Sequence, residues 1–439
     1  MLQEVKILAQ YITTKYGHKF GSRKELEDWQ ERKVRVLLQR ILLISEFYRD
    51  YFAGLDIAEW RNWPTINKQI MMKNFTRLNT VDVSKEEAFR VAFAAEESRN
   101  FTPTVHNITV GLSSGTSGNR GLFLASQDEQ AKWAGAILAK VLPGSLLKEH
   151  RIAFFLRANS NLYKTLGKHR IRFEFFDLLK PMAEHIASLN ALQPTIVVGP
   201  PSLLRLLSDA LCRDLRIVPE KVISVAEILD PLDKVYLEQR FQQIIHQVYQ
   251  CTEGFLGVTC SLGVLHLNED LVVIQKEYLD DEYKRFSPII TDFSRISQPI
   301  IRYRLDDVLK EKVGGCACGS PHVAIESIEG RCDDIFYLPA KNQQGVIPVF
   351  PDFIRRAIIT ADESIVEYIA IQRDESHIDI GLRYIGCDNV EQRVRLNLAT
   401  LWESMGIAPP HVNFIEIPVQ IPGRKLRRVE RQFEVAWKK

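Results

Sequence analysis

Apolar side chains recur at helical spacing along the first hundred residues of the chain. The large members of this stripe are Leu26, Trp29, Leu37, Ile41, Ile44 and Tyr48. Steps close to whole helical turns predict helices that bury one face against a larger body, and a helix that binds a partner is the alternative. We therefore expect residues 1–105 to form a mostly helical N-terminal part.

The middle of the chain alternates short apolar runs with helix-like segments. The runs are Arg151–Leu156, Thr195–Val198 and Val222–Ala226. Helical patterns at Ser202–Leu211 and Leu232–Phe241 follow the second and third runs, after turns that contain proline. Repeated strand, turn and helix predicts an α/β unit with parallel strands, whose ligands bind at the carboxyl ends of those strands.

Another pattern begins after Gly330 and predicts a small α+β unit. Its strand-like segments are Val366–Gln372, His377–Tyr384 and Val412–Ile417, and its helix-like segment is Val390–Trp402. The predicted fold class is thus α/β, with a large multi-layer N-terminal domain (residues 1–330) that contains mixed and parallel sheets. A small α+β C-terminal domain (residues 331–439) completes the chain.

Composition adds mainly exclusions to this picture. The 439 residues carry a net charge of +2, with 46% hydrophobic and 26% charged residues. A chain so close to neutral does not favour nucleic acid or a membrane surface as a partner. No run reaches the roughly 18 uncharged apolar residues of a membrane span, and no secretory signal is recognised. We expect a soluble cytoplasmic protein.

A glycine- and hydroxyl-rich segment, Gly111–Gly121, is the strongest chemical candidate. It reads GLSSGTSGNRG and lies between strand-like stretches at Ile108–Leu112 and Leu122–Ala125. Glycines let backbone amides approach an anion, and hydroxyls add donors without bulk, so the segment can cradle a polyphosphate. A flexible hairpin turn is the alternative, because glycine and serine also mark turns.

Cysteine and histidine form a second candidate site. The ligand candidates are Cys260, His266, Cys316 and Cys318, with His322 as an alternative to His266. Three thiolates and one imidazole match a closed structural Zn²⁺ site, whereas unlinked buried cysteines are the alternative. The odd total of seven cysteines argues against a disulfide framework.

The chain resembles the adenylate-forming superfamily, and most closely its phenylacetate–CoA ligase and coenzyme F390 synthetase branch. The resemblance rests on stretches that follow one another in the order of the family. They are Trp63–Lys68, Ser113–Gly118, Ser224–Glu227, Tyr249–Glu253, Pro299–Asp307, Gly330–Asp334 and Gly423–Val429. The Cys and His positions also resemble the zinc ligands of this branch. The resemblance implies that the small domain moves on a hinge.

The resemblance assigns the loop to the β- and γ-phosphates of ATP. The implied phosphate-binding residues are Ser113, Ser114, Gly115, Thr116, Ser117, Gly118 and Arg120. The family usually has a lysine after this loop, and here Asn119 stands in its place. Arg120 is the substitute we expect, although a guanidinium is not equivalent to an ammonium.

The motifs in the middle of the chain are implied to bind the rest of the nucleotide. Glu227 falls at the end of the strand that lines adenine in the family, and Tyr249 flanks the base. Thr252 is implied to donate to the α-phosphate. Glu253 is implied to bind Mg²⁺, a hard cation that prefers oxygen ligands.

The last motifs concern the ribose, the hinge and catalysis. Asp307 matches the aspartate that accepts the ribose hydroxyls, and Asp333 matches the hinge, with Arg331 beside it. Lys425 matches the late lysine that acts in the first half-reaction. One departure is Gln344–Pro351, which replaces the glycine-rich loop that serves the second half-reaction in CoA ligases.

The function implied by the resemblance is ATP-dependent activation of a small carboxylic acid as its acyl-AMP. The acceptor stays open between CoA, an amine and a carrier protein, and transfer of AMP to a hydroxyl acceptor is an alternative. Two further alternatives are a zinc-stabilised protein that binds nucleic acid through the basic segment Arg424–Arg431, and a member that binds nucleotide without chemistry. A homodimer is compatible with all of these.

Overall fold

The chain divides into two compact units in the computed structural model. The first unit comprises Met1–Glu227, Leu237–Leu305 and Glu311–Glu326, and the second comprises Ile228–Tyr236, Asp306–Lys310 and Ser327–Lys439. The structure describes residues 2–17, 19–98, 103–113, 120–156, 170–178, 180–211, 213–282, 284–342, 345–386, 389–418 and 426–433. Movement of the small C-terminal domain (residues 331–439) on a hinge stays a prediction.

The N-terminal part is mostly helical, as its apolar spacing predicts. Its helices are α1 (Leu2–Ile12), η1 (Thr13–Gly17), α2 (Arg23–Ile44), α3 (Glu46–Tyr51), η2 (Ile57–Asn62), α4 (Lys68–Lys73), α5 (Phe75–Leu78) and α6 (Lys85–Glu97). Side-chain caps begin several of them: the hydroxyl of Ser22 accepts the Glu25 amide in α2, and Asn67 accepts the Ile70 amide in α4. Each cap satisfies a backbone donor that has no partner within its helix.

A small antiparallel sheet carries the ends of the glycine-rich segment. It consists of β1 (Thr104–Val105), β2 (Ile108–Leu112) and β3 (Leu122–Ala125) in the order β1-β2-β3. The two strands expected on either side of the loop are therefore confirmed and pair with each other. Helix α7 (Gln127–Val141) follows and begins with a capping box between Ser126 and Glu129.

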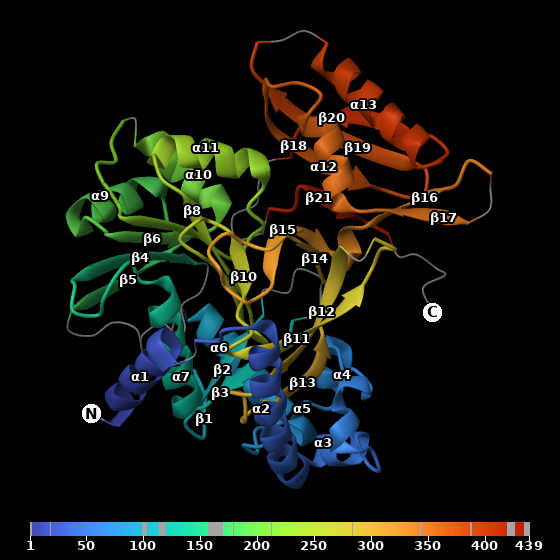
Figure 1. The fold of residues 1–439 in the computed structure, drawn as a ribbon. Helices are drawn as coiled ribbons and strands as arrows, with labels where there is room; N and C mark the ends of the chain where they lie inside the picture. The colour runs from blue at the N-terminus through green and yellow to red at the C-terminus, as the bar shows by residue number, and fades with distance from the viewer. Residues whose placement is uncertain are drawn as a thin grey trace. The chain divides into compact units, whose positions relative to one another are not determined.

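Five parallel strands form one end of the large sheet. They are β4 (His150–Leu156), β5 (Ile171–Asp177), β6 (Ile196–Gly199), β7 (Lys221–Ser224) and β8 (Ile245–Cys251), in the order β5-β4-β6-β7-β8. Helices α9 (Met182–Leu192), α10 (Pro201–Ala210) and α11 (Pro231–Phe241) follow β5, β6 and β7 (Figure 1). The strand and helix predictions for this region are confirmed.

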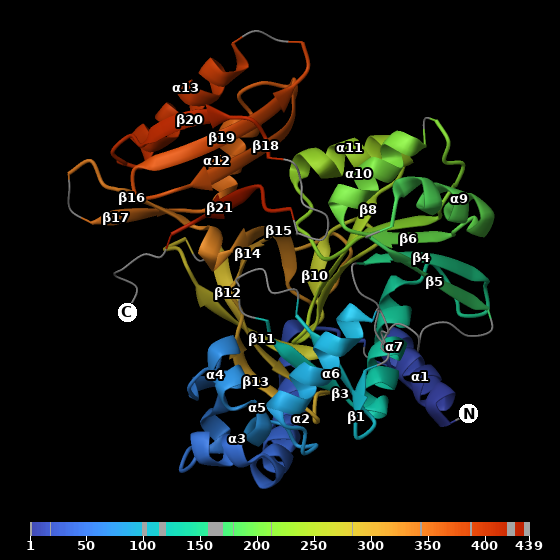
Figure 2. The same cartoon turned by 180° about the vertical axis from the view of Figure 1, so that it is seen from behind.

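Both faces of the parallel strands are covered, which explains their continuous apolar runs. Phe154 belongs to a core cluster with residues of α7 and α1, whereas the ring of the next residue, Phe155, meets His185 of α9 edge-on. Helices α1 and α7 pack together beside β4 and β5 in both views (Figure 1, Figure 2). A Cβ at Gly135 would lie 2.5 Å from the carbonyl oxygen of Ile7, so glycine permits this close contact.

Antiparallel strands continue the large sheet beyond β8. They are β9 (Gly254–Thr259), β10 (Leu265–Leu267), β11 (Val272–Tyr278), β12 (Arg285–Asp292), β13 (Ile300–Arg304), β14 (Asp307–Glu311) and β15 (Ala324–Arg331). Their order from β8 is β9-β10-β15-β14-β12-β11, and β13 pairs with β12. The boundary between the two units passes through β14 and β15.

The second unit has its own sheet and core. After a short helix, η3 (Cys332–Asp334), its elements are β16 (Phe336–Pro339), β17 (Val346–Val349), α12 (Pro351–Ile359), β18 (Ile365–Gln372), β19 (His377–Tyr384), α13 (Val390–Ser404), β20 (His411–Ile415) and β21 (Val429–Arg431). Four strands lie in the order β20-β19-β18-β21, and α12 and α13 share one core with them. The predicted α/β class with a smaller α+β unit is confirmed.

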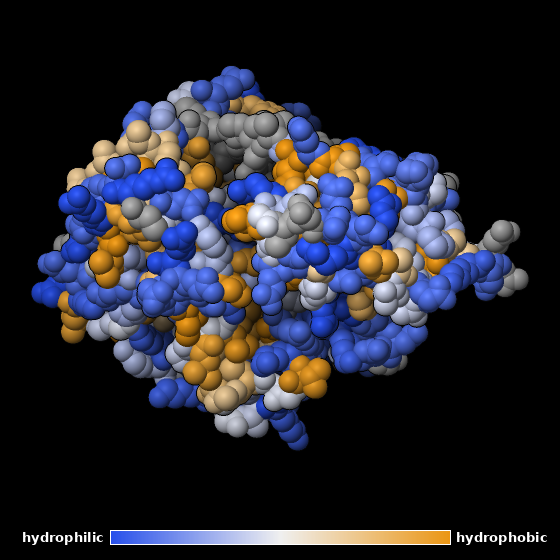
Figure 3. All heavy atoms as spheres, turned by 90° about the horizontal axis from the view of Figure 1, so that it is seen from above, coloured by the Kyte–Doolittle hydropathy of each residue, from blue (hydrophilic) through white to orange (hydrophobic). Residues whose placement is uncertain are grey.

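The face of the molecule drawn in Figure 3 is mainly polar. Figure 3 shows one face on which hydrophilic residues predominate, with smaller hydrophobic patches between them. Among the described residues, no helix combines the length and apolar character that crossing a membrane requires.

A buried network of polar and charged groups in the second unit joins the start of α11 to α12, to β18 and to the residue before β21. The Tyr368 hydroxyl donates to Asp230 at 2.7 Å, and Arg355 contacts the same carboxylate at 3.1 Å. Arg428 makes two hydrogen bonds with Asp233, at 2.8 and 2.9 Å. Because all five side chains are buried, each charge depends on its partners for solvation.

We expect Arg355→Met to lower the free energy of unfolding by roughly 3 to 5 kcal/mol, because it leaves the Asp230 charge buried without its main cation. Arg383→Met is the matched control, since Arg383 is exposed and pairs with Glu367 at the surface. It should cost less than about 1 kcal/mol. Urea denaturation followed by circular dichroism measures both variants. Equal stabilities for the two would contradict a role for the buried network.

Candidate functional site

Four of the predicted nucleotide-binding residues lie at or near the ends of two neighbouring strands. Glu227 follows β7, while Tyr249 lies on β8 and the pair Thr252 and Glu253 follows it. Strands β7 and β8 are parallel, with Ser224 opposite Gln247, so their carboxyl ends meet at one edge. This edge is where open α/β sheets bind ligands.

The backbone before Glu227 is strained. Ala226 has a φ of +67°, a left-handed conformation that residues with a Cβ rarely adopt. The Glu227 carboxylate accepts the Ser202 amide at 3.3 Å, across from the start of α10. Strain of this kind concentrates at ligand-binding sites, where neighbouring contacts hold it in place.

Glu253 is held by two hydroxyl groups. The Thr252 hydroxyl donates to one carboxylate oxygen at 2.8 Å, and the Tyr303 hydroxyl donates to the other at 3.1 Å. Arg295 donates to the Thr252 carbonyl at 3.2 Å and so fixes the turn. An oriented carboxylate fits the predicted Mg²⁺ ligand, since each oxygen retains a further lone pair.

Two hydrogen bonds close the base of the glycine-rich loop. The Ser113 amide donates to the Gly121 carbonyl at 2.8 Å, and the Gly121 amide donates to the Ser113 hydroxyl at 2.7 Å. The hydroxyl of Ser113 therefore lies at the mouth of the loop. The other predicted phosphate-binding residues of the loop lie outside the described residues: Ser114, Gly115, Thr116, Ser117 and Gly118.

Arg120 lies in a bidentate ion pair. Its guanidinium nitrogens donate to both carboxylate oxygens of Glu96, at 2.6 and 2.7 Å. The charge that we expected to replace the missing lysine is thus matched by a carboxylate in this structure. Contact of Arg120 with a phosphate stays a prediction, and it would require the pair with Glu96 to open.

Two polar residues that the sequence analysis did not select hold the strand after the loop. Gln298 accepts the Leu124 amide at 2.8 Å and donates to the Leu122 carbonyl at 3.2 Å. Arg295 donates to the Leu124 carbonyl at 3.1 Å as well as to Thr252. The sequence offered one signal for these two residues, which is that they lie directly before the Pro299–Asp307 motif. Together they connect the loop to the turn that carries Glu253.

The ribose and hinge candidates lie together in the second unit. Arg331 contacts Asp306 at 3.2 Å, and its amide donates to Asp334 at 2.9 Å. Burial alone would lower the pKa of Arg331, but the neighbouring carboxylates, Asp307 and Asp333 foremost, outweigh it and raise that pKa. Lys425, the predicted catalytic lysine, lies outside the described residues.

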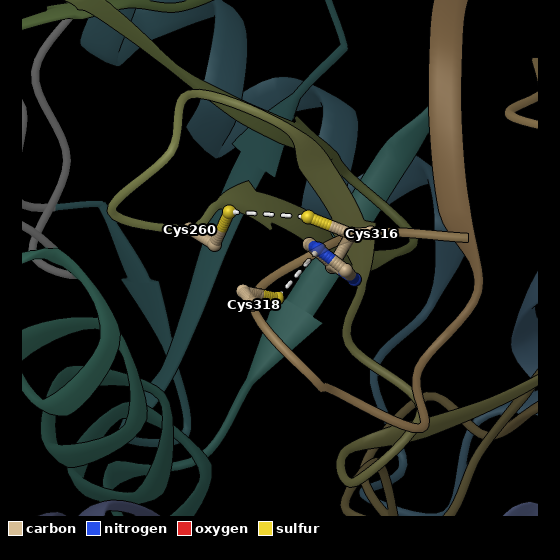
Figure 4. A group of neighbouring side chains, drawn as sticks. Cys260, Cys316 and Cys318 are labelled. Carbon is tan, nitrogen blue, oxygen red and sulfur yellow. Dashed lines mark hydrogen bonds between the residues drawn. The ribbon is translucent and has the colours of Figure 1, made fainter. Parts of the chain in front are cut away.

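The four predicted zinc ligands form one cluster in the first unit. The ligand atoms of Cys260, His266, Cys316 and Cys318 all lie within 4.8 Å of one another. Cys260 comes from the turn between β9 and β10, whereas Cys316 and Cys318 come from the loop between β14 and β15 (Figure 4). The sulfurs of Cys260 and Cys316 are 3.9 Å apart, and Cys318 lies 3.4 Å from the His266 Nε2.

The surroundings of the cluster suit a metal. A backbone N–H of Cys318 donates to the Cys316 sulfur, which lowers the pKa of that thiol to about 7. The other ring nitrogen of His266, Nδ1, lies 3.2 Å from the His322 carbonyl, a contact that orients the ring. The Nδ1 of His322 lies 3.1 Å from the Leu267 carbonyl, whereas His266 lies within the cluster. The structure therefore favours His266 as the ligand. These donors fit Zn²⁺.

The fold is similar to those of solved structures of a CoA ligase and an amide bond synthetase. A solved structure of 2-hydroxyisobutyryl-CoA ligase with 2-HIB-AMP matches 92% of this chain and 89% of that chain, with a TM-score of 0.67 and 14% identity. The amide bond synthetase McbA from Marinactinospora thermotolerans matches over 74% and 68% of the two chains, with a TM-score of 0.52 and 14% identity.

One curated protein is similar in sequence. It is the indoleacetate–lysine synthetase of Pseudomonas savastanoi, which is 26% identical over 233 residues. The match covers 49% of this chain and 56% of that protein, so the chain spans little more than half the length of this relative. No protein-family model matches the sequence.

We expect Cys316→Ser to abolish stoichiometric zinc binding and to lower the melting temperature, because a hydroxyl is a far poorer ligand than a thiolate. Cys251→Ser is the control, since Cys251 lies outside the cluster. Metal analysis of the purified proteins and thermal denaturation check both effects. Zinc-free wild-type protein, or full zinc content in Cys316→Ser, would contradict the assignment.

The left-handed backbone at Ala226 predicts an unusual effect of glycine. Ala226→Gly should raise the free energy of unfolding by up to about 1 kcal/mol, because glycine adopts this conformation without a steric cost. The same substitution at Ala88, inside α6, should lower it by about 1 kcal/mol. Chemical denaturation measures both, and effects of the same sign would contradict strain at Ala226.

Proposed function

We propose that this protein activates a carboxylic acid with ATP and forms an acyl-AMP. The observation that carries the proposal is the turn at Thr252 and Glu253, which follows β8 beside the end of β7. Arg295 links this turn to the strand that leaves the glycine-rich loop. The proposed Mg²⁺ ligand is thus connected to the base of the proposed phosphate loop, on a fold similar to that of a solved CoA ligase.

In the proposed reaction, a carboxylate oxygen of the acid bonds to the α-phosphorus of ATP while the bond to pyrophosphate breaks. Negative charge grows on the phosphate oxygens, so donors and cations aimed at them lower the barrier. We assign Thr252 as a donor to the α-phosphate and Lys425 as the cation that reaches the reacting oxygens. Mg²⁺ bound at Glu253 would neutralise phosphate charge.

Thr252 must turn for this role. Its hydroxyl donates to Glu253 in the structure, whereas the proposed state needs that proton directed to a phosphate oxygen. A metal ion on Glu253 would favour the change, because a bound cation withdraws electron density from the carboxylate oxygens and makes them weaker hydrogen-bond acceptors. The Tyr303 hydroxyl would still orient the other carboxylate oxygen.

The small C-terminal domain (331–439) is proposed to swing about Asp333 after the first step. The cluster of Asp307, Arg331 and Asp333 supports this assignment, because opposing charges surround the position where the chain enters that domain. Such motion would withdraw Lys425 and admit the acceptor.

An amine is the acceptor that we favour. The curated relative is named indoleacetate–lysine synthetase, and one fold neighbour is an amide bond synthetase. The replaced loop at Gln344–Pro351 argues against CoA, although another fold neighbour is a CoA ligase. Membership in the phenylacetate–CoA ligase and F390 synthetase branch is supported by the Cys and His cluster, and transfer of AMP to a hydroxyl acceptor remains its second candidate function.

The test is ATP–pyrophosphate exchange with a panel of aryl, indole-acetic, hydroxy and amino acids. We expect at least one acid to support exchange, and Lys425→Ala and Glu253→Gln to reduce it by about 100-fold or more, as losing a group that acts at the transition state does. Lys438→Ala, another lysine near the C-terminus, should retain exchange. Addition of lysine or CoA then identifies the acceptor by the product formed.

No exchange with any acid would overturn the proposal. Exchange that survives Lys425→Ala would leave acid activation in place and remove Lys425 as its catalytic lysine. A protein that binds nucleic acid instead would give no exchange, and its binding would fall steeply with salt.

A further inference from the structure

Lys68 lies at the mouth of the glycine-rich loop although it is far from the loop in sequence. Its ammonium nitrogen is 3.3 Å from the Ser113 hydroxyl. A Cβ added to Gly121 would lie 3.0 Å from the Cε of Lys68, so the side chain also passes close to the other end of the loop. The lysine therefore contacts Ser113 and passes beside Gly121, the two residues that close the loop base.

The backbone holds Lys68 in this position. Ile66 pairs with Tyr303 as a bridge between parallel segments: its amide donates to the Arg302 carbonyl at 3.0 Å, and its carbonyl accepts the Arg304 amide at 2.8 Å. Lys68 begins α4 directly after the Asn67 cap. Positions three and four residues apart share a helix face, which puts Lys68 on the face of Met71 and Met72.

That face of α4 is anchored on the strand after the loop. The Leu122 amide lies 3.5 Å from the Met72 sulfur, and the Gln298 side chain, which also holds Leu122, lies 3.4 Å from the Met71 sulfur. Lys68 thus reaches the loop from a fixed helix rather than from a flexible segment.

The loop needs a cation that its own sequence does not provide. A triphosphate carries several negative charges, and backbone amides and hydroxyls alone leave much of that charge unmatched. Asn119 is neutral, and Arg120 makes its bidentate pair with Glu96. Lys68 is half-buried, and its ammonium already contacts a loop hydroxyl.

We propose that Lys68 binds the β- and γ-phosphate oxygens of ATP and replaces the lysine that the loop lacks at Asn119. This inference rests on the proposed function, because it assumes that the loop binds a triphosphate. The bridge between Ile66 and Tyr303 also links Lys68 to Glu253, the proposed Mg²⁺ ligand, because the Tyr303 hydroxyl donates to that carboxylate. A cation and a metal-binding carboxylate would then act on the same phosphates.

The test compares nucleotides that differ only in the phosphates that Lys68 is proposed to contact. Titration calorimetry measures binding of Mg·ATP and of AMP to wild-type protein and to Lys68→Met. We expect Lys68→Met to weaken Mg·ATP binding by about 10- to 100-fold, the effect of losing a charge-assisted hydrogen bond, and to leave AMP binding unchanged. Lys68→Arg should restore part of the ATP affinity.

Lys73→Met is the matched control, because Lys73 ends the same helix and is exposed. It should bind both nucleotides as wild-type protein does. ATP binding by Lys68→Met equal to wild type would overturn the inference while the proposed function stands. Equal weakening of ATP and AMP would also overturn it, since this indicates a structural effect. Wild-type protein that binds no ATP would overturn both.

Discussion

The hydrogen bonds between Ser113 and Gly121 close a loop whose two ends must remain together for any anion to be held there. A glycine-rich loop is expensive to order, because each residue surrenders much backbone freedom. Interactions outside the loop hold the strand that follows it. Gln298 and Arg295 bind the main chain of the departing strand, and α4 packs on it through methionine sulfurs. The groups that surround the loop base are therefore positioned before a ligand arrives.

The second unit depends on a different constraint, which is the burial of charge. Asp230 and Asp233 precede and begin α11, yet their partners are Tyr368, Arg355 and Arg428, more than a hundred residues later in the chain. Arg428 belongs to the segment that follows Lys425, and the neighbouring Arg427 pairs with Asp334 beside the hinge candidate. Each buried carboxylate has a specific cationic partner. Rearranging the segment that contains Arg427 and Arg428 would therefore expose a charge or leave it buried without its partner. Burial thus restricts the segment to few arrangements.

The sequence pattern predicted strands and helices whose positions depend mainly on neighbouring residues. The strands around the loop and the strand His377–Tyr384 were recognised because branched and aromatic residues alternate or cluster between turns. The cluster of Cys and His side chains was recognisable because thiolates and imidazole at close spacing have few uses other than metal binding. The contacts of Lys68, Arg295 and Gln298 could not be predicted in this way. They join residues far apart in sequence, and only tertiary packing decides which polar side chain meets which backbone group.

Arg120 shows that residue type and spacing alone do not determine the partner of a charged side chain within a motif. A positive residue beside the missing lysine position is the natural substitute when only the sequence is considered, but its long side chain can reach several carboxylates. Glu96, at the end of α6, offers two oxygens that match the guanidinium fork, so the pair forms locally. An ammonium has no such planar match and can remain directed at a hydroxyl or phosphate. The same electrostatic requirement is then met by a lysine that approaches the loop from another helix.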